Sequence, residues 1–239
     1  MPEEICAQTD QLFFSTRRIR ANTVLVREGS LFGTLYVVGS GSFKCSQSDL
    51  EGYEQVLGFA LQGDVIGLDG LCEDRQSNTA IALEDSTVAM VPFRDFVRAS
   101  HELPALERLL HLSVSRELRR KSVAQHVMAA ASADVRLVRF LLEITSRHAS
   151  LGFSSRRLRL RMSRRDIGSY LGVAHETVSR SLKGLAEAGY IGVNHKELEI
   201  LDRDGLQRLQ RNTRGATERV CPSRKGQQAG AQAAVPLAA

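Results

Sequence analysis

Residues 162–188, MSRRDIGSYLGVAHETVSRSLKGLAEA, constrain the fold of this chain more than any other segment. Ser163 followed by Asp166 has the spacing of a helix-capping box, so a helix should begin here. Gly172 stands where a left-handed residue commonly ends a helix. The next helix has apolar side chains at i, i+4 and i+7, namely Val178, Leu182 and Leu185. The segment therefore predicts two short helices joined by a tight turn.

The other face of the second helix is polar. Its side chains at i, i+3, i+4 and i+7, which point the same way, are Glu176, Ser179, Arg180 and Lys183. This is the geometry of a helix-turn-helix, whose second helix lies in the DNA major groove. Arginine can donate two hydrogen bonds to guanine and glutamate can accept one from cytosine, so we expect Glu176, Ser179 and Arg180 to contact bases. The alternative is an ordinary helical hairpin with a solvated Glu176–Arg180 ion pair.

The net charge of +5 is unevenly placed. Residues 1–100 hold 8 Lys/Arg against 14 Asp/Glu, whereas residues 133–200 hold 12 against 7, and six arginines fall within residues 156–165. A basic domain beside an acidic one is expected when only one approaches a polyanion. We therefore expect contacts to DNA backbone phosphates rather than a merely solvated loop. The side chains predicted to make them are Ser163, Arg164, Arg165, His175, Thr177 and Lys183.

Residues 19–93 consist of short alternating segments separated by Gly, Ser and Asp. Many short strands at this spacing predict a β-sandwich or jelly-roll barrel, and the lack of helical patterns between them argues against a parallel α/β sheet. A cupin-like enzyme would need clustered histidines in this barrel. All six histidines lie at or after His101, so we expect no enzyme and no metal site.

From His101 the pattern becomes helical. A continuous helix of about 25 residues would run about 37 Å, longer than a small barrel can cover. We expect its stripe to pack against the same helix of a second copy, with packing on its own barrel as the alternative. The residues predicted at this dimer interface are Leu106, Leu110, Val114 and Leu118.

Residues 134–147 predict a further helix, and GYIGVNHKELEILD predicts two short strands, a wing, after the second helix of the motif. The expected organisation is a barrel in 1–100, a dimerisation helix in 101–131 and a winged helix-turn-helix in 132–205. Residues 212–239, rich in Gly, Gln, Ala and Ser, predict a disordered tail. There is neither a membrane-length apolar run nor a signal peptide, so the cytoplasm is expected.

Barrel, long helix and winged helix in this order resemble the CRP/FNR family of bacterial transcription regulators, over about residues 18–205. The resemblance implies an α+β fold with a cyclic-nucleotide-binding-like barrel. GDVIGLDGL (63–71), STVAMVPF (86–93) and MSRRDIGSYLGVAHETVSRSL (162–182) are similar to the fumarate–nitrate regulator branch. The family's E-x-x-S-R signature is present as Glu176, Ser179 and Arg180. Ala174 departs from the branch, which usually has a hydroxyl there to cap a backbone amide.

This resemblance also implies how such a protein acts. It implies a homodimer on an inverted repeat of TTGAT-like half-sites, and an activator that contacts RNA polymerase as well as promoter DNA, although activation and repression stay open. A loop at residues 47–55 resembles the region presented to polymerase, with a plain hairpin turn as the alternative. The residues concerned are Gln47, Asp49, Glu51 and Gly52.

Two effector chemistries of the family find little support in the residues. The cyclic-AMP branch uses a Glu and an Arg-Ser/Thr pair, and the matching positions here are Leu68 and Asn78–Thr79. Without the arginine, a buried cyclic phosphate would lack its counter-charge. The iron–sulfur branch needs a cysteine leader and a barrel cysteine, but the barrel position is Ala89, and Cys6, Cys45 and Cys72 lack the required spacing. We expect neither ligand; a cyclic-nucleotide- or haem-responsive regulator is the alternative.

Overall fold

The computed structural model describes residues 15–49, 51–130 and 132–211. The predicted tail, residues 212–239, lies outside this part of the chain. The first domain contains β1 (Ser15–Ile19), β2 (Val24–Val26), β3 (Thr34–Ser40), β4 (Ser42–Ser48), β5 (Glu54–Leu61), β6 (Val65–Ile66), the short 3-10 helix η2 (Leu68–Leu71), β7 (Thr79–Ala82), β8 (Ser86–Pro92) and α2 (Phe93–Glu102). There follow α3 (Pro104–Met128), α4 (Ala133–Ser150), β9 (Arg157–Arg159), α5 (Arg164–Leu171), α6 (His175–Glu187), β10 (Ile191–Asn194), β11 (Glu197–Ile200) and α7 (Arg203–Arg211).

The barrel consists of two four-stranded sheets, in the orders β1-β8-β3-β6 and β2-β7-β4-β5. All strand pairs described in it are antiparallel, as expected for a jelly roll with short connections. Apolar side chains from both sheets form one core because alternate residues of each strand point inward. This core includes Val38 and Val88 from one sheet and Phe43, Ala80 and Ala82 from the other.

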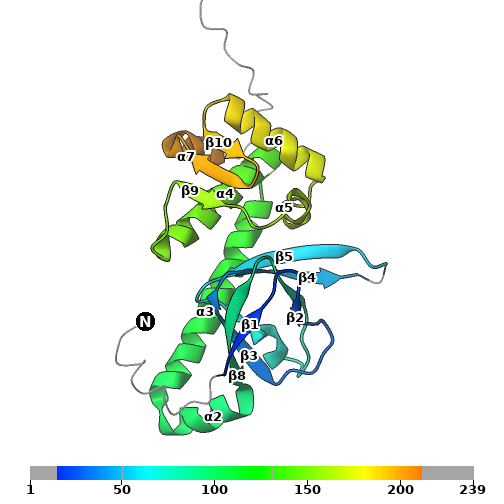
Figure 1. Cartoon of the computed structure of the whole chain (residues 1–239), viewed down its shortest axis with the longest axis vertical. Helices are drawn as coiled ribbons and strands as arrows, with labels where there is room; N and C mark the ends of the chain where they lie inside the picture. Colours follow the sequence, from blue (N-terminus) through cyan, green and yellow to red (C-terminus); the bar gives the residue numbers. More distant parts are fainter. Residues whose placement is uncertain (1–14, 50, 131, 212–239) are drawn as a thin grey trace, which may run out of the picture.

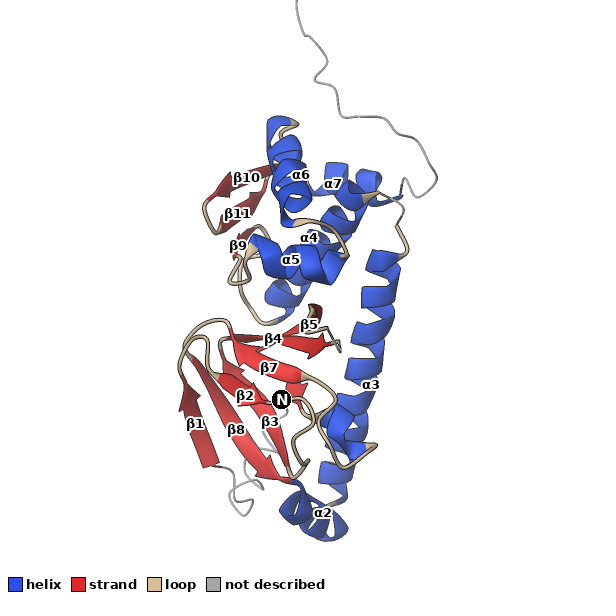
Figure 2. Ribbon diagram, turned by 90° about the vertical axis from the view of Figure 1, so that its right-hand side faces the viewer, coloured by secondary structure: helices blue, strands red, loops and turns tan. Residues whose placement is uncertain are grey.

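Helix α3 runs from the barrel to the C-terminal domain along one side of the molecule (Figures 1 and 2). It has the predicted 25 residues and begins with Pro104, whose fixed backbone angle suits a first turn. Its first turns pack on their own barrel, with Leu106 only 4% exposed beside Phe96. Leu106 therefore does not face a partner, which corrects that part of the predicted interface. Leu110 is half-buried against the same cluster.

The C-terminal domain is built on a second core. The antiparallel sheet β10-β11-β9 packs with α4–α7 around buried side chains that include Leu141, Ile167, Leu171, Val178 and Leu198. Strands β10 and β11 are the predicted wing. Strand β9 and helix α7 were not expected, and α7 carries the domain to residue 211, beyond the predicted limit of 205. Among the described helices, none is long and apolar enough to cross a membrane.

Candidate nucleic-acid interface

A reciprocal capping box begins the first helix of the motif, as the sequence predicted. The Ser163 Oγ accepts a hydrogen bond from the Asp166 backbone N–H at 3.0 Å. An Asp166 carboxylate oxygen accepts from the Ser163 N–H at 2.8 Å and from its hydroxyl at 2.6 Å. Two amides that a helix N-terminus would otherwise leave unpaired are thus satisfied, which fixes where α5 begins.

The turn between α5 and α6 depends on two glycines. Gly172 has φ +63° and ends α5 in the left-handed conformation that glycine adopts without strain. Gly168 lies so close to the turn that a Cβ atom there would be 2.7 Å from the Val173 carbonyl oxygen. The Val173 N–H in turn donates to the Gly168 carbonyl at 3.0 Å. This close approach sets the angle between the two helices.

Helix α6 has one buried and one exposed face. Val178, Leu182 and Leu185 are each less than 5% exposed and rest on the domain core. The opposite side carries exposed polar side chains at the predicted positions, which are Glu176, Ser179, Arg180 and Lys183. The apolar stripe therefore packs α6 against the domain core and leaves its polar face accessible to a ligand.

On this exposed face, Glu176 and Arg180 do not pair with each other. A Glu176 carboxylate oxygen lies 3.2 Å from His175 Nδ1, while the Arg180 guanidinium donates to Thr177 Oγ1 at 3.2 Å. The Ser179 hydroxyl donates to the His175 carbonyl at 3.0 Å. The alternative Glu176–Arg180 ion pair is therefore not formed in the described structure, and the ion pair along α6 is instead Lys183 with Glu187, at 3.6 Å. Both charged groups can reorient toward a ligand at the cost of weak, local contacts.

The predicted phosphate contacts surround this helix. Arg165 and Lys183 are exposed. Arg164 is half-buried, and burial lowers the pKa of its guanidinium, which donates to the His195 carbonyl at 3.2 Å. Ala174, at the start of α6, makes no side-chain cap, so no capping side chain competes with an anion for the first backbone amides of this helix.

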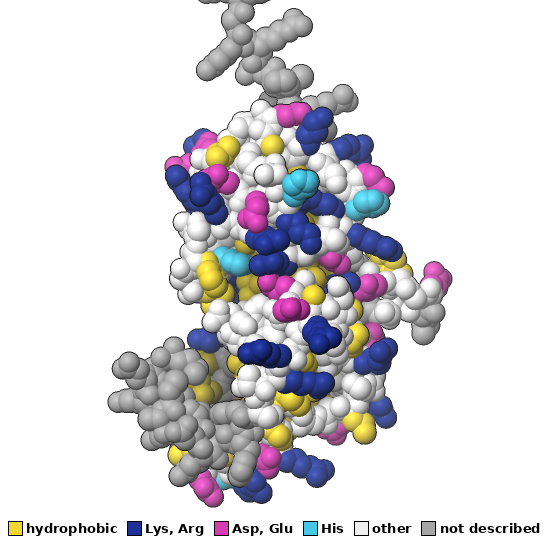
Figure 3. Space-filling model, viewed as in Figure 1, with side chains coloured by type: hydrophobic (Ala, Val, Ile, Leu, Met, Phe, Trp, Pro, Cys, Tyr) yellow, Lys and Arg dark blue, Asp and Glu magenta, His cyan; other side chains and the backbone are white. Residues whose placement is uncertain are grey.

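Residues 157–159 of the arginine run form a strand that the sequence did not reveal. Strand β9 pairs with β11, and two of its arginines bind wing glutamates: Arg157 to Glu199 at 3.1 Å and Arg159 to Glu197 at 3.4 Å. Lys and Arg side chains gather with carboxylates among them on the face of this domain seen in Figure 3. Part of the positive charge therefore supports the wing instead of standing free for phosphates.

The wing turn adds two polar residues, His195 and Lys196, that were missed as candidate contacts. His195 has φ +53°, and with Lys196 it borders a groove that also contains Arg159, Ser163 and Arg164. A basic residue at the tip of a predicted hairpin, next to the motif, was the signal that could have identified them.

The barrel holds α5 directly, which the sequence gave no reason to expect. The Ser169 hydroxyl accepts from the Val56 N–H at 2.9 Å and donates to the Glu54 carbonyl at 3.0 Å. Gln55 donates from its side chain to the Ser169 carbonyl. Strand β5 is thus hydrogen-bonded to the first helix of the motif.

Two ion pairs join the same surfaces. Lys44 of the barrel lies 2.8 Å from Glu54 and 3.2 Å from Asp166, the capping carboxylate of α5. Arg161 lies 2.9 Å from Glu84, so this member of the arginine run faces the barrel. The motif therefore has a defined orientation relative to the barrel.

The pKa shifts at this contact agree with its geometry. Burial alone would raise the pKa of Asp166, but hydrogen bonds from Ser163 and the charge of Lys44 outweigh it and lower that pKa. For Lys44, burial would lower the pKa, and its two carboxylate partners raise it instead. Both groups are therefore charged at neutral pH, and each stabilises the other.

Comparisons with known proteins agree with this architecture. Residues 16–102 match the cyclic nucleotide-binding domain and residues 135–209 the Crp-like helix-turn-helix domain. The chain is 35% identical to the transcriptional regulatory protein Btr of Bordetella pertussis, over 87% of this chain and 86% of Btr. It is 32% identical to the fumarate and nitrate reduction regulatory protein of Escherichia coli, over 87% of this chain and 83% of that protein.

A solved structure shows the same arrangement. FixK2 from Bradyrhizobium japonicum superposes with a TM-score of 0.75 at 29% identity, covering 83% of this chain and 98% of that chain. The arrangement of barrel, long helix and winged helix-turn-helix in this chain therefore matches that of a solved structure. This protein belongs to the CRP/FNR family of DNA-binding transcription regulators.

Proposed function

We propose that this regulator binds an inverted repeat of TTGAT-like half-sites as a homodimer, with Glu176, Ser179 and Arg180 of α6 contacting base edges. The observation that carries the proposal is the exposed polar face of α6 on a buried apolar stripe. Arg180 can donate two hydrogen bonds to one guanine, and Glu176 can accept from a cytosine amino group. TTGAT contains one guanine on one strand and its cytosine on the other.

Backbone contacts would fix the register of this helix. Arg165 and Lys183 present exposed cations on either side of the turn, and the start of α6, which no side chain caps, suits a phosphate oxygen. We assign the same role to Ser163, Arg164, His175 and Thr177, and add the wing residues His195 and Lys196. Such contacts contribute affinity that falls as salt rises.

The exposed apolar residues on α3 support dimerisation through this helix. Val114 and Leu118 are 36% and 64% exposed, and Leu112 is 43% exposed on the same middle turns. Pairing two copies of α3 would remove this apolar surface from water. Two recognition helices would then face half-sites about one helical turn apart, roughly 34 Å.

The hairpin β4–β5 supports a polymerase contact. Gln47, Asp49, Glu51 and Gly52 are all exposed at or near its tip. The Asp49 carboxylate accepts hydrogen bonds from the Glu51 and Tyr53 amides at 3.0 and 2.8 Å. The described residues of the tip therefore form an acidic projection on the barrel, suited to a basic protein surface.

For the effector, we infer that the barrel binds no cyclic nucleotide. The Asp69 carboxylate accepts hydrogen bonds from the Ser77 N–H at 2.9 Å, from its hydroxyl at 2.6 Å and from Asn78 Nδ2 at 2.9 Å. Asn78 replaces the arginine of the cyclic-AMP branch. The Ser77 and Asn78 groups that could donate hydrogen bonds to a phosphate thus already donate to Asp69, whose negative charge would also repel an anion.

We also infer no iron–sulfur cluster. Within the described residues, no group of three His, Cys, Asp or Glu side chains could hold a metal ion. Burial raises the pKa of the Cys45 thiol to about 12, which opposes the thiolate form that binds iron. Cys6 lies outside the described residues.

Binding to defined duplexes tests the proposed function. A duplex with two TTGAT half-sites in inverted repeat is compared with one in which both are scrambled, by fluorescence anisotropy at fixed salt. We expect at least a hundredfold preference for the repeat and two protomers per duplex, since specific sites typically exceed non-specific DNA by about 10³-fold or more. Equal affinity for both duplexes would contradict the proposed half-site.

A further inference from the structure

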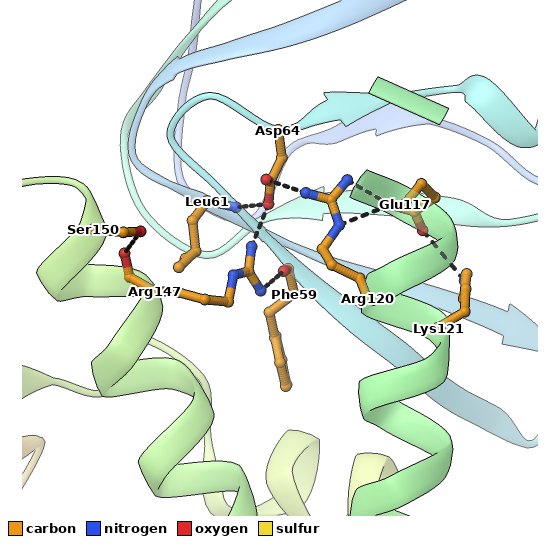
Figure 4. A network of polar contacts seen from close by, with 8 residues as sticks. All are labelled: Phe59, Leu61, Asp64, Glu117, Arg120, Lys121, Arg147 and Ser150. Atoms are coloured by element: carbon orange, nitrogen blue, oxygen red, sulfur yellow. Dashed lines mark hydrogen bonds and ion pairs between the residues drawn. The ribbon is translucent and has the colours of Figure 1, made fainter. Parts of the chain in front are cut away.

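Helix α4 is held at its C-terminal end by a carboxylate of the barrel. Asp64, in the turn after β5, receives a hydrogen bond from the Leu61 N–H at 2.8 Å and ion pairs from Arg147 of α4 and Arg120 of α3 (Figure 4). Arg147 also donates to the Phe59 carbonyl at 3.0 Å. One barrel side chain thus joins the long helix and the DNA-binding domain.

The surroundings of Asp64 strengthen this connection. The side chains of Asp64, Arg120 and Arg147 are only 13%, 23% and 21% exposed. Charge-assisted hydrogen bonds that are partly shielded from water are stronger and more directional than exposed ones. Arg120 has a second carboxylate partner in Glu117, at 2.8 Å. Among the described residues, Asp64 is the carboxylate with which Arg147 forms an ion pair.

The opposite end of α4 is held in a different way. Arg139 is buried and donates to the His126 carbonyl of α3 at 2.5 Å and to the Gln210 carbonyl of α7 at 3.3 Å. Arg136 donates to the Ala130 carbonyl at 2.8 Å. The bonds to His126 and Ala130 join α4 to the end of α3, the bond to Gln210 joins it to α7, and none of these bonds involves the barrel. The link between α3 and α4 can therefore act as a hinge at this end, while Asp64 holds the other end of α4 to the barrel.

We propose that Asp64 is a positioning residue that sets the orientation of the DNA-binding domain relative to α3, through Arg147 and Arg120. This inference rests on the proposed dimer and inverted repeat. A two-fold repeat is read only when both recognition helices are correctly spaced at once. Loss of the Asp64 contacts would leave each domain held to the barrel by the contacts of α5 with β5 and by the Lys44 and Arg161 ion pairs, and would widen its range of rotation about the link between α3 and α4. Binding to two half-sites together would weaken, while binding to one would not.

The test compares two duplexes and two variants. Asp64→Asn removes the charge with little change of shape, and Arg147→Gln removes its partner. We expect each to lower the affinity for the two-half-site TTGAT duplex about tenfold, within the roughly 5- to 150-fold range typical of coupling between sites. A duplex with one half-site scrambled should bind within twofold of wild type. The double variant should lose about as much affinity as Asp64→Asn alone, since that variant already lacks the ion pair with Arg147.

A matched control separates this role from a general effect of lost charge. Asp95→Asn breaks an ion pair with Arg98 at 3.0 Å that lies within α2 and touches no second domain. We expect both duplexes to bind it as they bind wild type. Equal loss on the two duplexes in Asp64→Asn would indicate a merely structural role and overturn the proposal, as would no loss on either.

Hydrogen exchange tests the same contact without DNA. In Asp64→Asn, the Val56 amide, which donates to Ser169 of α5, should exchange several-fold faster, while β8 amides in the barrel core exchange as in wild type. Unchanged exchange at Val56 would overturn the proposal. If wild-type protein binds neither duplex, the proposed half-site fails, and this exchange measurement still decides the role of Asp64.

Discussion

Two helical glycines in the motif should respond oppositely to alanine. At Gly168 a Cβ atom would lie 2.7 Å from the Val173 carbonyl oxygen and 3.3 Å from the His175 nitrogen, both backbone atoms of the turn. At Gly184, inside α6, a Cβ atom meets nothing within 4 Å. Alanine favours a helix interior over glycine by about 1 kcal/mol at either position. The two sites therefore differ in steric clash alone.

The expected magnitudes follow from these distances. Overpacking of a fixed backbone costs roughly 1–3 kcal/mol, which exceeds the helical gain, so Gly168→Ala should destabilise the domain by up to about 2 kcal/mol. Gly184→Ala should stabilise it by about 0.5–1 kcal/mol. At about 2–4 °C per kcal/mol for a chain of this size, the midpoints of thermal unfolding should separate by several degrees. A Gly168→Ala protein as stable as Gly184→Ala would refute the tight-turn geometry.

Further predictions concern charge, assembly and cofactors. Lys183→Ala should weaken binding to specific and scrambled duplexes alike and reduce the slope of log affinity against log salt by about 1, and an unchanged slope would remove Lys183 from the phosphate contacts. Leu118→Glu should shift the sedimentation coefficient from dimer to monomer, whereas an intact dimer would place the interface elsewhere. Because the pKa of Asp166 is lowered in the folded state, its contribution is complete above the ordinary value of 3.8 and is lost as pH falls below it. The pKa of Lys44 is raised, so its contribution to folding stability is complete below pH 10.5 and is lost at higher pH. The midpoint of thermal unfolding should therefore fall at both acid and alkaline pH in wild type, and should fall less in Asp166→Asn. The purified protein should lack the visible absorbance and iron of a haem or iron–sulfur protein, and a brown, iron-bearing sample would contradict the effector inference.

Local chemistry made much of the motif predictable. The capping pair Ser163 and Asp166, the left-handed Gly172 and the apolar stripe of α6 each act within a few residues, so spacing alone locates them. The alternation of the barrel strands and the length of α3 were predictable for the same reason. The family resemblance supplied the order of the domains, which the match to two family domains confirms.

Other features depend on partners far away in the chain. Lys44 and Asp166 are 122 residues apart, and no local pattern links them. The apolar stripe of α3 showed that Leu106 would be covered, but not that its own barrel covers it. Strand β9 is rich in arginine, but its Leu158 is buried in the domain core and its two arginines lie opposite glutamates of β11, long-range effects that strand propensity does not contain.

Selection of bound sequences from random duplexes, run in parallel with wild type and Arg180→Ala, tests the central claim most directly. The proposed role of α6 predicts enrichment of an inverted repeat with TTGAT-like half-sites by wild type. In the variant, the specific site should bind about 1–3 kcal/mol more weakly and the preference at one base pair of each half-site should relax. Identical preferences in the two proteins, or no enriched sequence with wild type, would contradict base reading by this helix.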